Sequence, residues 1–349
     1  MIIKDTLSIL WKINRTCNFR CSYCFDSVAV RSDPANRCSD LSRTDVRAVA
    51  ASFDALPLDT HIIITGGEPF LYPDFTTMCL TLTQRHRLSL TTNLSTDNVL
   101  AFADTIDPAR VGGIRCSLHL LERERLGLMQ DLRQKLACFR KQGFTIYVTE
   151  VLSPPVLSRL ETLAAEFGTE GIIIWPILMR GRWQGGRYPA HYSREQRRLI
   201  RRYYERLAQQ DSSMLFEGFA KSERGLTFLD GQVSFKGHPC RAGMNSVFMQ
   251  PNGDIQRCPD VREPLGNLFQ GAFQRQTAIT PCPTLVCNCP WNGYSLAHGK
   301  PRILGKYNLG FQIRQTIRDF IRSPDGKLAT VTRAAVGILE SRLGIRLWE

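Results

Sequence analysis

The sequence predicts an α/β protein in which parallel strands alternate with crossover helices. Short apolar runs and longer amphipathic runs alternate six times between residues 7 and 209. The short runs predict strands, and the runs with apolar residues at helical spacing predict helices. Six such units in succession indicate a parallel sheet. Eight units would close a complete barrel, and this chain provides six.

The predicted elements follow one another in a regular order. Strands are expected near residues 7–14, 60–65, 88–93, 112–118, 144–150 and 171–178, and helices near 42–55, 73–86, 96–104, 128–142, 155–167 and 193–209. In the fourth helix an apolar stripe at helical spacing predicts a face packed on the core: Leu128, Leu132, Leu136 and Phe139. The sixth helix opens on a capping box, Ser193-x-x-Gln196.

Composition limits the class of protein. A length of 349 residues allows one large domain or two ordinary ones. A hydrophobic content of 43% is enough for a sizeable core. No apolar run approaches the roughly 20 residues of a membrane span. Met1–Asp5 precede a strand-like run and do not resemble a signal peptide. With twelve cysteines in such a chain, metal binding or catalysis is favoured over disulfides, and we expect a soluble, cytoplasmic protein.

The net charge of +13 is spread along the chain. Its densest part holds seven arginines between Arg187 and Arg206. We interpret this stretch as the solvated face of a helix, with a site for a polyanion as the alternative. A nucleic-acid partner is therefore not favoured, although an acidic peptide would suit the charge.

Three cysteines follow the first predicted strand with the spacing C-x3-C-x2-C: Cys17, Cys21 and Cys24. Thiolates favour iron–sulfur clusters or zinc. A structural zinc site has a closed shell, often of two close pairs, whereas the next cysteine is Cys38 and the first histidine is His61. A cluster with three protein ligands, which leaves one iron open, is the favoured interpretation. Zinc, a disulfide or chance remain as alternatives.

This triplet resembles the signature of the radical S-adenosylmethionine (radical SAM) enzymes. In that family the open iron of a [4Fe–4S] cluster chelates SAM, and one electron breaks its C–S bond to leave a 5′-deoxyadenosyl radical. Tyr23 matches the aromatic position that the family places against adenine. Gly66-Gly67-Glu68-Pro69, after the second strand, matches the family's GGEP motif, which binds the amino group of SAM. The resemblance implies a partial (β/α)6 barrel of the TIM type.

The physical chemistry of these positions agrees with that resemblance. Glycines allow a backbone to approach a ligand closely, and the Glu68 carboxylate can accept from an ammonium group. Ligands bind at the carboxyl ends of strands in βα architectures. By resemblance, Asn93, Ser117 and Glu150 at the ends of strands three to five are candidates to contact the ribose or methionine part of SAM. A helix cap or a loop hydrogen bond is the alternative for each.

A second group of cysteines follows residue 215: Cys240, Cys258, Cys282, Cys287 and Cys289. Asn252-Gly253 between two alternating runs predicts a β-hairpin. This part resembles the SPASM and twitch extensions of radical SAM enzymes, which hold auxiliary iron–sulfur clusters. Five thiolates cannot complete two four-iron clusters, so we expect one auxiliary [4Fe–4S] cluster bound by four of the five. We favour Cys287 and Cys289 beside Cys240 and Cys258, with a four-cysteine zinc site as the alternative.

The expected organisation is a radical SAM partial barrel at 1–215, a twitch/SPASM-like domain with a β-hairpin at 216–305, and basic C-terminal helices at 306–349. The other cysteines are expected to be buried or inert: Cys38, Cys79, Cys116 and Cys138.

By resemblance, the chain is expected to cleave SAM reductively and to remove hydrogen from a substrate C–H bond, with the auxiliary cluster as electron acceptor and a flavodoxin or ferredoxin as electron donor. A ribosomal precursor peptide is the favoured substrate, to be cross-linked, oxidised or epimerised. The chain begins close to its first strand, which leaves no room for a leader-binding domain and weakens that interpretation. A small metabolite such as an aminocyclitol or sugar is the alternative, followed by RNA. A non-catalytic iron–sulfur or zinc scaffold is disfavoured by the intact GGEP motif.

Overall fold

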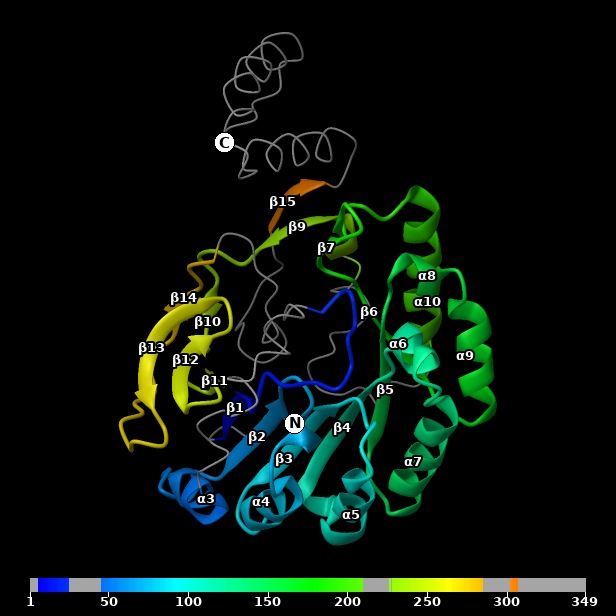
Figure 1. The fold of residues 1–349 in the computed structure, drawn as a ribbon. Coiled ribbons are helices and arrows are strands. Elements are labelled where there is room, and N and C mark those ends of the chain that lie inside the picture. Colours follow the sequence, from blue (N-terminus) through cyan, green and yellow to red (C-terminus); the bar gives the residue numbers. More distant parts are fainter. Residues whose placement is uncertain (1–5, 25–44, 210–225, 227, 285–301, 307–349) are drawn as a thin grey trace, which may run out of the picture.

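The computed structural model describes residues 6–24, 45–209, 226, 228–284 and 302–306. Its centre is a nine-stranded sheet with the order β13-β12-β11-β1-β2-β3-β4-β5-β6 (Figure 1). Its parallel core confirms the predicted α/β class: β1 (Leu7–Lys12), β2 (Thr60–Thr65), β3 (Arg87–Thr92), β4 (Val111–Ser117), β5 (Ile146–Val151) and β6 (Ile174–Ile177).

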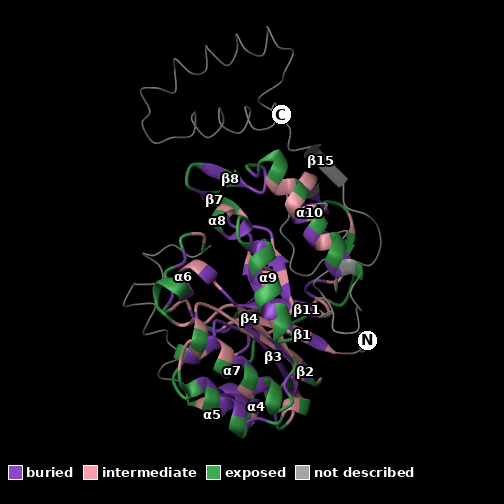
Figure 2. Cartoon of the chain, turned by 90° about the vertical axis from the view of Figure 1, so that its right-hand side faces the viewer, coloured by how far each residue is buried: buried purple, intermediate pink, exposed green. Residues whose placement is uncertain are grey.

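Alternating side chains give this sheet two different faces. In β1, Leu7, Ile9 and Trp11 are buried, whereas the alternating residues, among them Leu10 and Lys12, are only partly buried. The buried set packs under helices on one side of the sheet (Figures 1 and 2): α3 (Val46–Asp54), α4 (Phe75–Leu82), α5 (Asn98–Thr105), α7 (Met129–Lys141) and α9 (Leu160–Thr169). We call the opposite face, which carries the partly buried set, the inner face of the sheet.

The inner face has its own apolar cluster. Leu10, Ile63, Val151 and Trp175 pack against buried residues of the segments that follow β6. These segments are the short hairpin of β7 (Gly181–Trp183) and β8 (Gly186–Tyr188), and helix α10 (Arg194–Gln209). The predicted capping box of α10 is confirmed, because Ser193 Oγ accepts from Gln196 N at 3.1 Å and Gln196 Oε1 accepts from Ser193 N at 2.9 Å.

The C-terminal strands join the same sheet. β11 (Ser246–Met249) pairs in parallel with β1, and β12 (Asp254–Cys258) and β13 (Val261–Asn267) continue outward in antiparallel pairs. The predicted hairpin is confirmed between β11 and β12, with Gly253 at φ 87° in its turn. The sheet therefore runs without interruption from the predicted barrel into the predicted auxiliary segment, and the domain bounds stay a prediction.

Two short pairs of strands lie in this part of the chain. β10 (Pro239–Cys240) pairs with β14 (Thr280–Pro281), and β9 (Gly231–Ser234) pairs with β15 (Arg302–Lys306). The predicted basic helices at 306–349, as well as Cys38, Cys287 and Cys289, lie outside the described residues.

The structure departs from the expected elements at two helices. The helix expected at 155–167 is interrupted: α8 (Pro154–Leu157) ends before Arg159, whose φ of −118° leaves the helical region, and α9 begins at Leu160. A further helix, α6 (Leu120–Arg125), was not predicted because its six residues are too short to show a period. The stripe of α7 is confirmed, since Leu132, Leu136 and Phe139 are at most 1% exposed.

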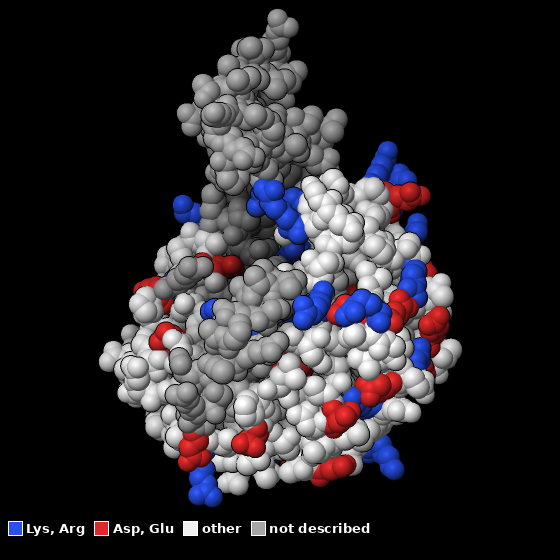
Figure 3. Space-filling view, viewed as in Figure 1, with Lys and Arg blue, Asp and Glu red and all other residues white. Residues whose placement is uncertain are grey.

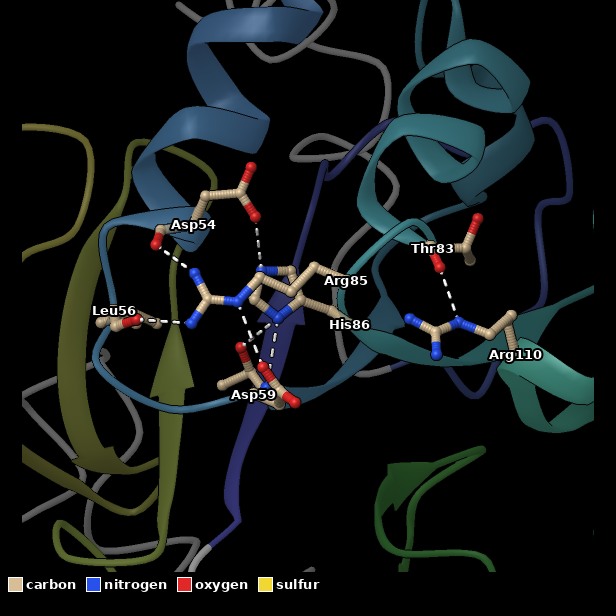
Figure 4. Close-up of polar contacts among 8 residues, drawn as sticks. Asp54, Leu56, Asp59, Thr83, Arg85, His86 and Arg110 are labelled. Carbon is tan, nitrogen blue, oxygen red and sulfur yellow. Dashed lines mark hydrogen bonds and ion pairs between the residues drawn. The ribbon is translucent and has the colours of Figure 1, made fainter.

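The edge of the sheet opposite the strands' carboxyl ends is closed by a polar network (Figure 4). Arg85 donates from Nη2 to the Leu56 carbonyl at 3.1 Å and from Nε to Asp59 Oδ1 at 3.1 Å. His86 is hydrogen-bonded through Nε2 to Asp54 Oδ1 at 3.1 Å. These contacts join the ends of α3 and α4 to the start of β2, so they explain the packing of this edge.

Across the described ranges, no helix is long and apolar enough to cross a membrane.

Candidate active site

The predicted cysteine triplet lies on the loop that follows β1, and the loops after β3 hold its first part. Asn18 Nδ2 donates to Ser95 Oγ at 2.7 Å, and Asn93 Nδ2 donates to Asn18 Oδ1 at 3.0 Å. The Asn93 carboxamide also accepts from Ser95 N at 2.9 Å. Asn93 therefore contacts the cysteine loop directly, and this placement adds a structural role to the predicted ligand role.

The segment after β4 holds the middle of the loop. Arg20 N donates to Glu122 Oε1 at 2.7 Å, and the Tyr23 hydroxyl and His119 Nδ1 are 2.8 Å apart. The ring of Phe19 meets that of His119 edge-on, with centroids 5.9 Å apart. His119 takes a left-handed conformation with φ 49° at the start of α6, which turns the chain back over the loop.

The β7–β8 hairpin supplies a third contact. Trp183 Nε1 donates to Ser22 Oγ at 2.9 Å, between Cys21 and Cys24. The indole is 9% exposed and packs edge-on against Tyr188. Segments after β3, β4 and β6 therefore fix the cysteine loop at the carboxyl edge of the sheet.

The three thiols are close enough to influence one another. Burial raises the pKa of Cys21 to about 12, and the neighbouring charges of Cys17, Cys24 and Glu122 add to the rise. Mutual repulsion of thiolates marks a place where a cation or a metal cluster would be stabilised. Within the described ranges, no set of three or more His, Cys, Asp or Glu side chains has the geometry of a metal site. The three thiols therefore suit an iron–sulfur cluster in their chemistry, although their side chains do not converge on one point in this structure.

The glycines of the predicted GGEP motif allow a close approach of two backbone segments. A Cβ on Gly67 would lie 2.1 Å from the Thr16 carbonyl oxygen, and a Cβ on Gly66 would lie 2.7 Å from that of Asn14. Gly67 N donates to Asn14 O at 3.1 Å, and Asn14 Nδ2 donates to Glu68 O at 2.8 Å. This turn is packed directly against the start of the cysteine loop, so the two sequence motifs form one structural unit.

Glu68 is turned into the protein. Its side chain is 0% exposed and accepts hydrogen bonds from Thr92 Oγ1 at 2.6 Å, Asn93 N at 2.7 Å and Phe70 N at 3.1 Å. Burial raises the pKa of Glu68 to about 7 against the lowering effect of these bonds. In this arrangement the Glu68 carboxylate is buried and hydrogen-bonded to the protein, and its contact with the amino group of SAM stays a prediction.

The other predicted contacts separate onto the two faces of the sheet. Ser117 has the inner-face parity of β4, beside Thr149 of β5. Glu150 has the opposite parity, and its Oε2 accepts from Leu120 N at 2.9 Å at the start of α6. Burial raises the pKa of Glu150 to about 8, and among the residues that the structure describes its Oε1 has no hydrogen-bond partner. Ser117 therefore suits the predicted contact, whereas Glu150 serves the start of a helix.

Sequence reasoning missed Arg123, which is 0% exposed. Its Nε donates to the Leu118 carbonyl at 2.9 Å, its Nη2 donates to the Asn93 carbonyl, and its guanidinium lies 5.2 Å from the centre of the Phe19 ring. The available signal was the position of a charged residue three places after Leu120, on the buried side of a helix. Asn14, 4% exposed, was missed because one asparagine after a strand resembles an ordinary turn residue.

The second cysteine group is partly described. Cys240 and Cys282 are 5% and 9% exposed and belong to the inner apolar cluster, against which Cys258 packs. Cys282 N donates to His238 O, and Gly237 N donates to Cys282 O, at 2.9 and 2.8 Å. Three of the five predicted ligands are thus gathered in one region. Cys79 and Cys116 are fully buried, as expected, and Cys138 is partly buried.

Comparisons with known proteins match the part of the chain that contains this site. Residues 11–148, which contain the cysteine loop and the GGEP turn, match the model of the radical SAM superfamily. An 84-residue stretch is 36% identical to GTP 3′,8-cyclase of Haemophilus ducreyi and covers 23% of this chain and 24% of that enzyme. The corresponding enzyme of Klebsiella pneumoniae subsp. pneumoniae is 34% identical over 84 residues, 23% of this chain and 25% of that enzyme. The match spans about a quarter of the length of these curated relatives.

Solved structures share the fold. The structure of anSMEcpe with bound AdoMet has a TM-score of 0.52 and 15% identity, and the match covers 76% of this chain and 79% of that one. Its complex with AdoMet and the Cp18Cys peptide gives 0.52 and 14%, with 76% and 78% covered. Residues 11–148 form a radical SAM domain, and members of that superfamily use a [4Fe–4S] cluster and SAM. The mostly parallel α/β fold is shared with these solved structures.

Proposed function

We propose that this protein is a radical SAM enzyme that modifies a carbon centre of its substrate. The observation that carries the proposal is the placement of the Cys17–Cys24 loop. Contacts from three other segments hold it at the carboxyl edge of the sheet, packed against the turn of Gly66 and Gly67. Ligands bind at this edge in βα folds.

Cys17, Cys21 and Cys24 would hold the cluster, and the backbone of the GGEP turn with Asn93 and Ser117 would position SAM. When bound, the cluster and SAM supply reductive cleavage of SAM and removal of a hydrogen atom from a substrate C–H bond. Phe19 and Tyr23 cover the loop on the side of His119. We propose that these rings exclude water from the reacting groups.

The second cysteine group is proposed to hold one auxiliary [4Fe–4S] cluster as electron acceptor. The neighbourhood of Cys240, Cys258 and Cys282 in the inner apolar cluster supports Cys282 as a ligand, in place of the pair Cys287 and Cys289 that the spacing favoured. One of those two would then complete the set. Zinc in this place is tested by metal analysis: anaerobically reconstituted Cys21→Ala protein retains about four irons if the second site holds a four-iron cluster, and zinc instead of iron otherwise.

We propose a peptide as substrate. The support is the likeness of fold to anSMEcpe, which has been crystallised with AdoMet and a peptide. A small metabolite is the second candidate, and the partial match to GTP 3′,8-cyclase favours it. The two are separated by adding candidate peptides or nucleotides to the reduced protein and observing which increases the formation of 5′-deoxyadenosine. A flavodoxin or ferredoxin is the proposed electron donor, which places the reaction in the reducing cytoplasm.

The proposal is tested by incubating the reconstituted, reduced full-length protein with SAM. The wild-type protein should form 5′-deoxyadenosine, and Cys21→Ala should form none, because the cluster loses one of three ligands. Cys138→Ala is the matched control, since this partly buried cysteine lies on α7 among the outer helices, and it should keep the activity. Product formation by Cys21→Ala, or none by the wild-type protein, would exclude the proposed activity.

A further inference from the structure

A row of hydrogen-bond donors crosses the inner face of the sheet directly below the candidate active site. In the strand register Lys12 pairs with Thr65, Thr91 pairs with Arg115, and Arg115 pairs with Tyr147. Ile64 pairs with Leu90, so the next residues, Thr65 and Thr91, continue the row between β2 and β3. Five neighbouring strands thus contribute one side chain each at the same level.

All five side chains are on the inner face. Each of them is partly buried. The residue next to each along its strand points to the opposite face and is at most 2% exposed under the outer helices, as Trp11 in β1 and Ile64 in β2 show. We call Lys12, Thr65, Thr91, Arg115 and Tyr147 the donor row. It contains two cations and three hydroxyl groups, and none of its members is a carboxylate.

The position of the donor row relates it to the candidate active site. Gly66 follows Thr65 directly, Asn93 follows Thr91 by two residues, and Ser117 follows Arg115 by two. Two residues along a strand correspond to roughly 6.6 Å, so the row lies one side-chain level below the proposed SAM contacts. The next level on the other side is apolar at β1 and β2, where Leu10 pairs with Ile63.

We infer that the donor row binds an oxyanion of the substrate, a carboxylate or a phosphate, close to the carbon that reacts. Lys12 and Arg115 stand on β1 and β4, three strand spacings or roughly 14 Å apart in a flat sheet. Their long side chains can approach a common centre from both sides. An arginine fork binds carboxylate and phosphate through two parallel hydrogen bonds, and Lys adds a second positive charge.

Burial of Arg115 supports a strong interaction with an anion there. Removal from water lowers the pKa of Arg115 to about 10. A guanidinium in such surroundings is weakly screened, so an oxyanion beside it is bound more strongly than at the surface. This inference rests on the proposed function for the identity of the site, and with a peptide substrate it predicts an acidic side chain next to the modified residue.

The test measures binding by titration calorimetry of the full-length, reconstituted protein with SAM. The probes are a capped pentapeptide with a central glutamate, the same peptide with a central glutamine, and inorganic pyrophosphate. We expect the glutamate peptide to bind about tenfold more tightly than the glutamine peptide, the factor typical of one charge-assisted hydrogen bond. Tighter binding of pyrophosphate that also depends on Arg115 would support the oxyanion site and assign it to a phosphate.

Variants decide whether the donor row carries this preference. Arg115→Met and Lys12→Met should each remove most of the tenfold preference, whereas Arg182→Met, at an exposed arginine of β7, should keep it. Lys12 ends its strand, so its variant remains informative if Arg115→Met does not fold, as judged by thermal unfolding. Equal binding of both peptides together with pyrophosphate binding that does not depend on Arg115 would overturn the inference, and so would an unchanged glutamate preference in both variants. Formation of 5′-deoxyadenosine by the wild-type protein tests the proposed function separately.

Discussion

Each of the two cysteine groups lies beside a buried arginine that binds carbonyl groups of the surrounding loops. Arg123, behind the Cys17–Cys24 loop, is 0% exposed and donates to the carbonyls of Leu118 and Asn93. Arg257, next to Cys258, is 4% exposed and donates to the Ala242 carbonyl at 3.0 Å. Both arginines thus connect a strand end to the loops around thiols.

The two arginines differ in what surrounds them. The charges of Glu68 and Glu150 act on Arg123, and Arg123 in turn lowers the pKa of both carboxyls against the effect of burial. Arg257 is hydrogen-bonded to backbone carbonyls, including those of Thr280 and Pro281 at 3.0 and 3.3 Å. The first region is therefore an ionisable network of a guanidinium and two carboxyl groups, whereas in the second, among the described residues, the arginine binds backbone carbonyls only, an arrangement that we call a backbone clamp.

The largest expected effect compares the two arginines directly. At pH 9, where both carboxyl groups are ionised, Arg123→Ala should lower the free energy of unfolding by about 3–5 kcal/mol, because it leaves two buried carboxylates without a neighbouring cation. Arg257→Ala should cost about 1–3 kcal/mol, because it leaves only neutral carbonyls unsatisfied. Urea unfolding of the two variants at pH 9 measures the difference. Equal costs, or a larger cost at Arg257, would contradict the distinction between the two regions.

The ionisable network should also give the stability a dependence on pH. The pKa of Glu150 is about 8 in the folded protein, above its ordinary value of 4.5, so the folded state binds this proton more tightly than the unfolded state. The contribution of protonated Glu150 to the free energy of unfolding is fully present below about pH 4.5 and is lost as the pH rises towards 8.

The measurement is urea unfolding of the wild-type protein and Glu150→Gln at pH 5.5 and 7.5. Glu150→Gln should remove about 2 kcal/mol of the decrease in stability between these values. The same change at Glu205, which is exposed on α10, controls for the substitution itself and should leave the decrease intact. A parallel pH profile for wild type and Glu150→Gln would show that Glu150 does not titrate in this window.

The parts of the fold that the sequence predicts are those with a local cause. The six parallel strands and α7 follow from side-chain periodicity, and the turn at Gly253 follows from the backbone freedom of glycine. The pairing of β11 with β1 was not predicted, because the free edge of β1 exists only after the sheet has formed. The interruption before α9 was missed because two prolines at a helix start are compatible with a single helix.

The candidate site also contains features that the sequence predicts and features that depend on tertiary structure. The cysteine spacing and the two glycines were recognisable in the sequence, and the structure brings them together. The direction of Glu68 was not predictable, because it depends on donors from Thr92 and Asn93 of another strand. Arg123 has the same property, since its partners become neighbours only in the folded chain. Motifs therefore locate the chemistry, and the surrounding network that holds it follows from tertiary structure.

The smallest expected effect concerns the contact between the β7–β8 hairpin and the cysteine loop. Trp183→Phe keeps the ring packed against Tyr188 but removes the donor to Ser22 Oγ. One neutral hydrogen bond contributes about 1 kcal/mol. Amide hydrogen exchange of residues 17–24 should therefore become about fivefold faster in this variant, with little change in the second cysteine region.

A double-mutant cycle shows whether this one bond is responsible. Ser22→Ala removes the acceptor, so it should accelerate exchange to a similar extent, and the double variant should add little to either single change. Additive effects would mean that the indole and the hydroxyl act on the loop separately. If exchange at Cys240 and Cys258 accelerated as much as at the cysteine loop, the hairpin would stabilise both regions, and the contrast between an ionisable network and a backbone clamp would not extend to their dynamics.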